Sequence, residues 1–122
     1  MDDEPFQADL VTRLLESLGY SVVPMTNSIE ALELFRYNPD RFDLVITDMT
    51  MPRITGDMLA REMWALRPEL PIILCTGYSE KIDKAHALQL GFRDFAMKPI
   101  VIKDLARMLR RTLEEAQPAK RN

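Results

Sequence analysis

An acidic residue closes an apolar run in the middle of the chain. The run is Leu44-Val45-Ile46-Thr47, and it is followed by Asp48, by Met49-Thr50-Met51-Pro52 and then by Gly56. Two further charged groups are the cluster Asp2-Asp3-Glu4 and the pair Lys98-Pro99, which follows the apolar run Phe95-Ala96-Met97. Carboxylates combined with a lysine suit phosphoryl transfer assisted by a divalent metal ion.

Each of these groups has a definite task in such a reaction. Asp48 must be ionised to attack phosphorus, and its negative charge repels the incoming phosphoryl group. Mg²⁺ offsets that repulsion. This small hard cation prefers oxygen ligands such as Asp3 and Asp48, with Asp2 acting through water. Lys98 stabilises the charge that spreads over the equatorial oxygens in the transition state. Pro99 locks its own φ angle and removes a donor, which fixes the chain that presents the lysine.

Helices and strands alternate along the chain. Helical spacing and end signals predict helices over roughly 5–18, from an N-cap at Ser28 to the turn at 38–40, through Met58 to Leu66, over about 81–90, and over about 101–116. Short apolar runs predict strands at 22–25, 44–47, 71–76 and 94–97. Pro24 places the first of these at an edge, because proline in a central strand removes a ladder hydrogen bond.

The apolar character of the strands predicts how they are arranged. Strands this uniformly apolar are covered on both faces, so we expect a parallel sheet with helices on each side. Ligands of such sheets bind beyond the carboxyl ends of the strands. Asp3, Asp48, Thr76 and Lys98 all lie at predicted strand ends, so they are expected to meet at one edge of the sheet.

Composition excludes several other classes of protein. The 122 residues, 47% of them hydrophobic, fit one domain at 1–117 followed by a tail at 118–122. A net charge of −3 gives no electrostatic case for nucleic acid. No apolar stretch reaches the roughly 18 residues that cross a membrane, and the N-terminus is acidic, so we expect a cytoplasmic protein. Cys75 is the single cysteine, which excludes an internal disulfide framework. It stands in an otherwise apolar predicted strand, so we expect a small buried residue.

Five motifs in order make the chain similar to a known family. They are Asp2-Asp3, Asp48 after an apolar strand, Met51-Pro52 with Gly56, Thr76 at the end of a strand, and Lys98-Pro99 after Phe95-Ala96-Met97. With these features the chain resembles the response-regulator receiver domain, the CheY-like phosphoacceptor of two-component signalling. The likeness covers nearly the whole chain. It implies an α/β, doubly wound, flavodoxin-like parallel sheet of five strands in the order 2-1-3-4-5, flanked by five helices.

The resemblance also implies a role for each site residue. Asp48 would be the phosphorylated carboxylate, and Lys98 and Thr76 would contact the phosphoryl group. Asp2, Asp3, Asp48 and the main-chain carbonyl of Thr50 would hold Mg²⁺. Phe95 would be an aromatic switch that changes rotamer together with Thr76, while Pro52, Gly56 and Pro99 would be structural.

The resemblance implies partners as well. A histidine kinase or a phosphotransfer domain would supply the phosphoryl group. A downstream protein would read the surface of the fourth helix, fifth strand and fifth helix. The segment 71–80 also resembles receivers at the C-terminus of hybrid sensor histidine kinases. The chain itself would be a stoichiometric phosphoacceptor and not an enzyme.

One departure from the family concerns the first strand. Receivers have an apolar central strand before the acidic pair, whereas only Met1 precedes Asp2 in this sequence. We therefore expect a first strand that is missing or truncated, or one that is borrowed from a partner.

Two alternatives from other classes stay open. A degenerate receiver that serves only as a binding module would not take up a phosphoryl group. A phosphatase or phosphomutase with an aspartyl-phosphate intermediate would need a second acid two residues after Asp48, where Thr50 stands. Individually, Thr50 and Thr76 are compatible with ordinary turn hydroxyls, and Phe95 with plain core.

Overall fold

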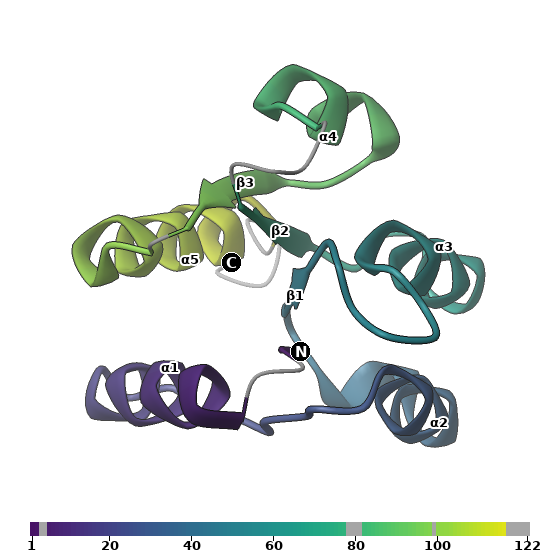
Figure 1. Cartoon of the computed structure of the whole chain (residues 1–122), viewed down its shortest axis with the longest axis horizontal. Coiled ribbons are helices and arrows are strands. Elements are labelled where there is room, and N and C mark those ends of the chain that lie inside the picture. The colour runs from purple at the N-terminus through teal and green to yellow at the C-terminus, as the bar shows by residue number, and fades with distance from the viewer. Residues whose placement is uncertain (3–4, 78–81, 99, 117–122) are drawn as a thin grey trace, which may run out of the picture.

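The computed structural model describes residues 1–2, 5–77, 82–98 and 100–116, and in this part five α-helices alternate with three strands (Figure 1). The helices are α1 (Pro5–Ser17), α2 (Ser28–Tyr37), α3 (Gly56–Leu66), α4 (Lys84–Leu90) and α5 (Ile102–Ala116), with a 3-10 turn, η1 (Pro39–Arg41), after α2. The strands are β1 (Val45–Asp48), β2 (Ile72–Thr76) and β3 (Asp94–Met97).

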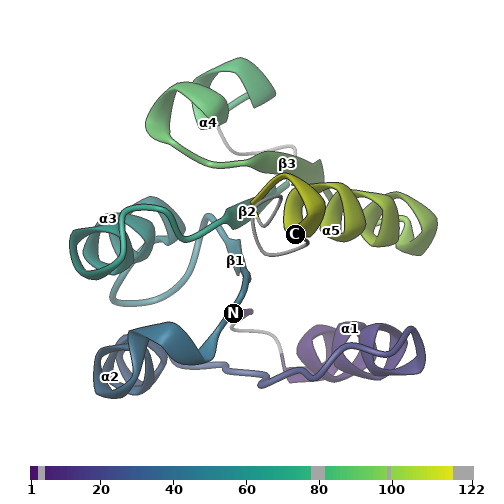
Figure 2. The ribbon, with the colours of Figure 1, turned by 180° about the vertical axis from the view of Figure 1, so that it is seen from behind.

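The three strands form one parallel sheet in the order β1-β2-β3. Val45 pairs with Ile72, and Ile73 pairs with Asp94. Every residue of the central strand β2 is buried, as expected for a parallel strand covered on both faces. Helices α1 and α5 lie on one side, α2 and α3 lie on the other, and α4 lies beyond β3 (Figures 1 and 2). The parallel α/β architecture predicted from the sequence is therefore confirmed.

Two apolar clusters hold these layers together. The larger one lies on the α2 and α3 side and includes Phe35, Leu59, Ile72 and Leu74. The smaller one lies between α1 and α5, where Leu15 is buried together with Leu105 and Leu109. None of the helices in the described part combines the length and apolar character that crossing a bilayer requires.

The expected five-stranded sheet is incomplete in the described part of the chain. The three observed strands are the last three of the expected order, and Val22–Met25, predicted as an edge strand, is not a strand. A segment becomes a β-strand only when its backbone forms hydrogen bonds with a neighbouring strand. In the described part of the chain, the backbone contact of this segment is with Asp2, whose N–H donates to the Met25 carbonyl at 3.0 Å.

Two helix starts also differ from the sequence prediction. Ser28 was expected to cap α2, but Asn27 is the N-cap, and its side chain accepts hydrogen bonds from the N–H groups of Ile29 and Glu30. The helix expected from about residue 81 begins at Lys84, because Asp83 caps it by accepting from the His86 N–H at 2.8 Å. In both cases a neighbouring Asn or Asp satisfies the first free N–H groups of the helix.

We expect Asn27→Ala to lower the free energy of unfolding by about 1 kcal/mol, because two N–H groups of α2 lose their acceptor. Asn38→Ala is the matched control, since Asn38 precedes η1 without a side-chain capping bond. Urea denaturation of the two variants measures the difference. Equal midpoints would show that the cap adds nothing to stability.

Candidate functional site

Asp48 and Lys98 form the centre of the candidate site. Asp48 ends β1 and is only 6% exposed. The Lys98 ammonium donates a hydrogen bond to Asp48 Oδ2 at 2.8 Å. The backbone N–H of Lys98 donates to the Thr76 carbonyl at 2.7 Å, which fixes the lysine beside the end of β2. Two residues 50 positions apart in the sequence are thus joined at the carboxyl edge of the sheet, where the sequence placed them.

Asp2 is the third residue of the site. Its Oδ2 atom lies 3.9 Å from the Lys98 ammonium, and its side chain is largely buried. Its position follows from the chain beside β1, where the Asp48 N–H donates to the Met1 carbonyl at 3.1 Å. The ammonium of Lys98 therefore lies within reach of two carboxylates.

Burial and charge shift the acidity of this pair. Burial raises the pKa of Asp48 to about 7, although the hydrogen bond from Lys98 acts in the opposite direction. Burial by itself lowers the pKa of Lys98, but the hydrogen bond and negative charge of Asp48 outweigh it and leave that pKa above its ordinary value. The lysine is thus charged at neutral pH, and additional positive charge beside Asp48 would favour its ionised form.

Thr76 ends β2 next to this pair and is fully buried. Within the described part of the chain its hydroxyl oxygen has no hydrogen-bond partner. Buried hydroxyl groups are nearly always paired, and an unpaired one is costly. A hydroxyl of this kind at the edge of the sheet is suited to a ligand that brings its own oxygen atoms.

The loop after Asp48 is held by backbone contacts that leave no room at Gly56. The Met49 N–H donates to the Cys75 carbonyl at 2.9 Å, and the Gly56 N–H donates to the Met49 carbonyl at 2.7 Å. A Cβ atom on Gly56 would lie 2.1 Å from the backbone oxygen of Asp48. Glycine is therefore required here by the close approach of α3 to the end of β1.

Ser28 supports this loop, although the sequence predicts only a capping role for it. It is buried at the start of α2, and its hydroxyl donates to the Pro52 carbonyl at 3.1 Å. Arg53 follows with a φ angle of 72°, a left-handed conformation that is rare for residues other than glycine. The only sequence signal for the contact between Ser28 and Pro52 is a serine at a helix start, and such a serine is equally typical of an N-cap.

The remaining predicted site residues have less defined surroundings. Thr50 is exposed, and Phe95 is half-buried against the larger apolar cluster. Asp3 and Pro99 lie outside the described residues. Within the residues that are described, no three His, Cys, Asp or Glu side chains gather in a metal-binding cluster.

Two further residues near the site, Cys75 and Asp94, are buried. Burial raises the pKa of the Cys75 thiol to about 12, which fits the small buried residue that the sequence predicted. Asp94 is buried at the start of β3 and pairs with the guanidinium of Arg111 and with the Lys84 ammonium at 3.9 Å. Arg111 of α5 thus contacts a buried carboxylate of β3.

The fold and the site together define a parallel α/β domain with an aspartate–lysine pair at the carboxyl edge of its sheet. The family described as response regulator receiver domain matches residues 1–110. The chain belongs to this family and is a receiver domain of two-component signal transduction.

Solved structures and curated proteins agree with this assignment. A response regulator receiver domain protein from Clostridium thermocellum superimposes with a TM-score of 0.90 at 29% identity, covering 97% of this chain and 94% of that one. The receiver domain of a signal transduction histidine kinase from Syntrophus aciditrophicus gives a TM-score of 0.83 at 31% identity, covering 96% and 89%. The transcriptional regulatory protein GlrR of Escherichia coli is 33% identical over 98% of this chain, which spans only 26% of GlrR.

Proposed function

We propose that this receiver domain accepts a phosphoryl group on Asp48 and acts as a switch that a partner reads. The observation that carries the proposal is the Lys98 ammonium 2.8 Å from a buried carboxylate at the carboxyl edge of the sheet. Such an arrangement combines a nucleophile with a fixed positive charge, which are the two groups that phosphoryl transfer requires.

The transfer makes one bond and breaks one bond. An oxygen of the ionised Asp48 forms a bond to phosphorus, while the bond between phosphorus and its donor breaks and its electron pair stays on the donor atom. In a phosphohistidine donor that atom is an imidazole nitrogen. Lys98 stabilises the charge on the transferring oxygens. The Thr76 hydroxyl, which has no partner among the described residues, donates a hydrogen bond to the same group.

Receiver domains generally use Mg²⁺, and the residues present fit that ion. The carboxylates of Asp2 and Asp48 both approach one ammonium, and burial disfavours the ionised form of Asp48. A cation bound here would supply the charge that offsets repulsion between the carboxylate and the phosphoryl group. Its ligands would be Asp2, Asp3, Asp48 and the Thr50 carbonyl.

The partners follow from two-component signalling, in which a histidine kinase or a phosphotransfer domain is the donor. We infer that a downstream protein reads the face formed by α4, β3 and α5, where β3 is the fifth strand of the family. Large apolar side chains are exposed on these elements and at the start of α5, namely Leu88, Met97 and Val101. Thr76 and Phe95 would couple this face to the site.

Incubation with acetyl phosphate tests the proposal by intact mass. The chain is expected to gain the mass of one phosphoryl group when Mg²⁺ is present and none when the metal is chelated. Asp48→Asn is the control, because the amide cannot act as the nucleophile, and it is expected to gain nothing. A wild-type chain that is folded, as judged by circular dichroism, yet gains no mass would instead favour a receiver that serves only as a binding module.

A further inference from the structure

The loop that follows Asp48 is fixed at both of its ends by backbone contacts. At its start the Met49 N–H donates to the Cys75 carbonyl, and at its close the Gly56 N–H donates to the Met49 carbonyl. These bonds tie the loop to the end of β2 and to the start of α3. The stretch 50–54 between them is placed by other contacts.

A hydrogen bond from α2 holds the middle of this loop. The Ser28 hydroxyl donates to the Pro52 carbonyl at 3.1 Å, across 24 positions of the sequence, and Ser28 is only 3% exposed. Asn27 already accepts from the Ile29 and Glu30 N–H groups, so the cap of α2 does not need the Ser28 hydroxyl. That hydroxyl is therefore available to the loop.

The Pro52 carbonyl accepts a second hydrogen bond, which closes a strained turn. The Ile54 N–H donates to this carbonyl at 2.8 Å, and the bond forms a γ-turn with Arg53 at its centre. The φ angle of Arg53 is 72°, and a residue other than glycine keeps this conformation only where its surroundings impose it. Arg53 is exposed, so the bonds to the Pro52 carbonyl impose the turn and packing of the arginine does not.

Apolar packing on either side of the turn leaves the direction of this carbonyl open. Met51 is buried before the turn, and Ile54 packs after it against the larger apolar cluster. These contacts fix side chains, whereas the hydrogen bond from Ser28 fixes the peptide group between Pro52 and Arg53. Without that bond the peptide group is free to turn over, which gives Arg53 an ordinary negative φ angle.

We propose that Ser28 is a positioning residue for the metal site. By holding the Pro52 carbonyl, it maintains the strained turn at Arg53 and thereby fixes the main chain at Thr50. The inference rests on the proposed function, in which the Thr50 carbonyl is a ligand of Mg²⁺. Thr50 lies midway between Asp48, which ends β1, and Pro52, which Ser28 holds. A turn of the peptide group after Pro52 reaches Thr50 through a single intervening residue.

The requirements of Mg²⁺ make the position of this main chain important. The ion needs a nearly octahedral set of oxygen atoms at about 2.0–2.1 Å, so a small displacement of one ligand weakens binding. Removal of a group that holds a metal ligand in place typically costs about 10- to 100-fold in affinity. Ser28 acts through the loop and not on the ligand itself, so we expect the lower end of this range.

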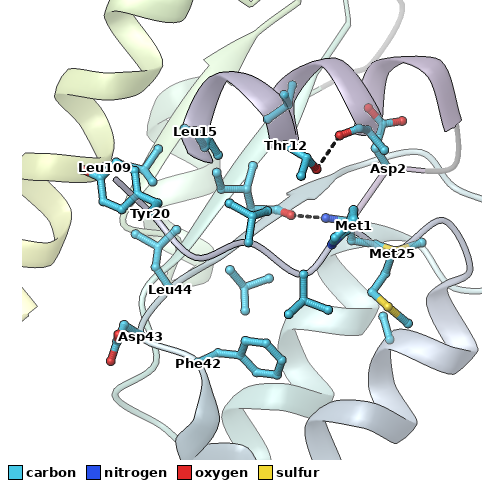
Figure 3. Close-up of a pocket in the computed structure, with 18 of the residues that line it drawn as sticks. Met1, Asp2, Thr12, Leu15, Tyr20, Met25, Phe42, Asp43, Leu44 and Leu109 are labelled. Atoms are coloured by element: carbon cyan, nitrogen blue, oxygen red, sulfur yellow. Dashed lines mark hydrogen bonds between the residues drawn. The ribbon is translucent and has the colours of Figure 1, made fainter. Parts of the chain in front are cut away.

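The contact of Ser28 is separate from a cavity of about 370 Å³ that lies beside β1 (Figure 3). Met1, Asp2 and Asp48 belong to the lining of that cavity. Among the described residues that line it, there is neither Ser28 nor any member of the loop 49–55. A substitution at Ser28 therefore leaves the lining of this cavity intact.

Ser28→Ala tests the proposal through the affinity for Mg²⁺ and through the loop itself. We expect titration calorimetry, at a pH well above the pKa of Asp48, to show about tenfold weaker Mg²⁺ binding. Amide exchange at Ile54, measured without metal, should become about tenfold faster because its acceptor is no longer held. Ser17→Ala is the matched control, since the Ser17 hydroxyl donates to the Leu14 carbonyl within α1, and it should change neither quantity.

Two substitutions of Arg53 separate positioning from a loss of stability, because both remove its charge. Glycine adopts a positive φ angle without strain, so Arg53→Gly should keep the turn even without the Ser28 hydroxyl. In that background we expect Ser28→Ala to weaken Mg²⁺ binding by less than about threefold. Proline holds φ near about −65°, so Arg53→Pro should bind Mg²⁺ about tenfold more weakly than Arg53→Gly although Ser28 is present.

Unchanged Mg²⁺ affinity in a Ser28→Ala chain with a normal circular dichroism spectrum would overturn the proposal. An equal loss of affinity with and without Arg53→Gly, or equal affinities of Arg53→Gly and Arg53→Pro, would do the same. A wild-type chain that binds no Mg²⁺ would overturn this proposal together with the metal ligands proposed above. A wild-type chain that binds Mg²⁺ but takes up no phosphoryl group would overturn the proposed function alone.

Discussion

Lys98→Met is expected to lower the rate of phosphoryl uptake from acetyl phosphate by about 100-fold at saturating Mg²⁺. The lysine donates to Asp48 at 2.8 Å, and removing one preorganised donor of this kind costs about 10²–10³ in rate. Methionine keeps most of the length of the side chain and removes both its charge and its hydrogen-bond donor. The rate of mass gain measures the loss, and Lys103→Met on the exposed face of α5 serves as the control.

The same substitution should strengthen Mg²⁺ binding, which distinguishes loss of the charge from loss of the fold. The Lys98 ammonium lies 2.8 Å from Asp48 and 3.9 Å from Asp2, so it opposes any cation at these carboxylates. A charge pair at 4 Å is worth about 1 kcal/mol even in bulk water, which corresponds to at least about fivefold tighter binding. Titration calorimetry measures the Mg²⁺ affinity of both proteins at a pH well above the pKa of Asp48, because loss of Lys98 raises that pKa. Weaker binding in Lys98→Met, with a normal circular dichroism spectrum, would contradict the arrangement proposed for the site.

The centre of the site could be predicted from the sequence because few elements determine it. Apolar runs ending in Asp48, Thr76 and Lys98 predicted parallel strands, and parallel strands bring their carboxyl ends to one edge. The structure confirms that Asp48 and Lys98 are in contact there. No comparable sequence pattern predicts the contact between Ser28 and the Pro52 carbonyl, because this contact depends on how α2 packs against a loop.

The region around Val22–Met25 shows where local pattern is insufficient. Its residues, Pro24 included, suit an edge strand, yet the structure has no strand here. A ladder requires a partner strand, and among the described residues only Asp2 bonds to this segment through the backbone, at the Met25 carbonyl. The sequence pattern describes what a segment can form, whereas the neighbouring chain decides whether it forms.

Gly56→Ala is expected to lower the free energy of unfolding by about 2–4 kcal/mol. Alanine normally favours a helix by up to about 1 kcal/mol over glycine, so propensity alone predicts the opposite sign at this first residue of α3. The added Cβ atom would lie 2.1 Å from the Asp48 backbone oxygen and 2.9 Å from its carbonyl carbon. Both are backbone atoms of the strand end that presents the carboxylate, so the loop or the strand must move.

Gly77→Ala is the matched control, because a Cβ atom there meets nothing within 4 Å. It lies directly after Thr76 at the same edge of the sheet, and we expect a change of less than about 1 kcal/mol. Urea denaturation compares the two glycines, and mass gain with acetyl phosphate shows whether the displaced loop also slows phosphoryl uptake. If both variants unfolded at the wild-type midpoint, the close approach of α3 to Asp48 would be wrong. A selective loss at Gly56 would mean that the helix position and the nucleophile position are set by a single backbone contact.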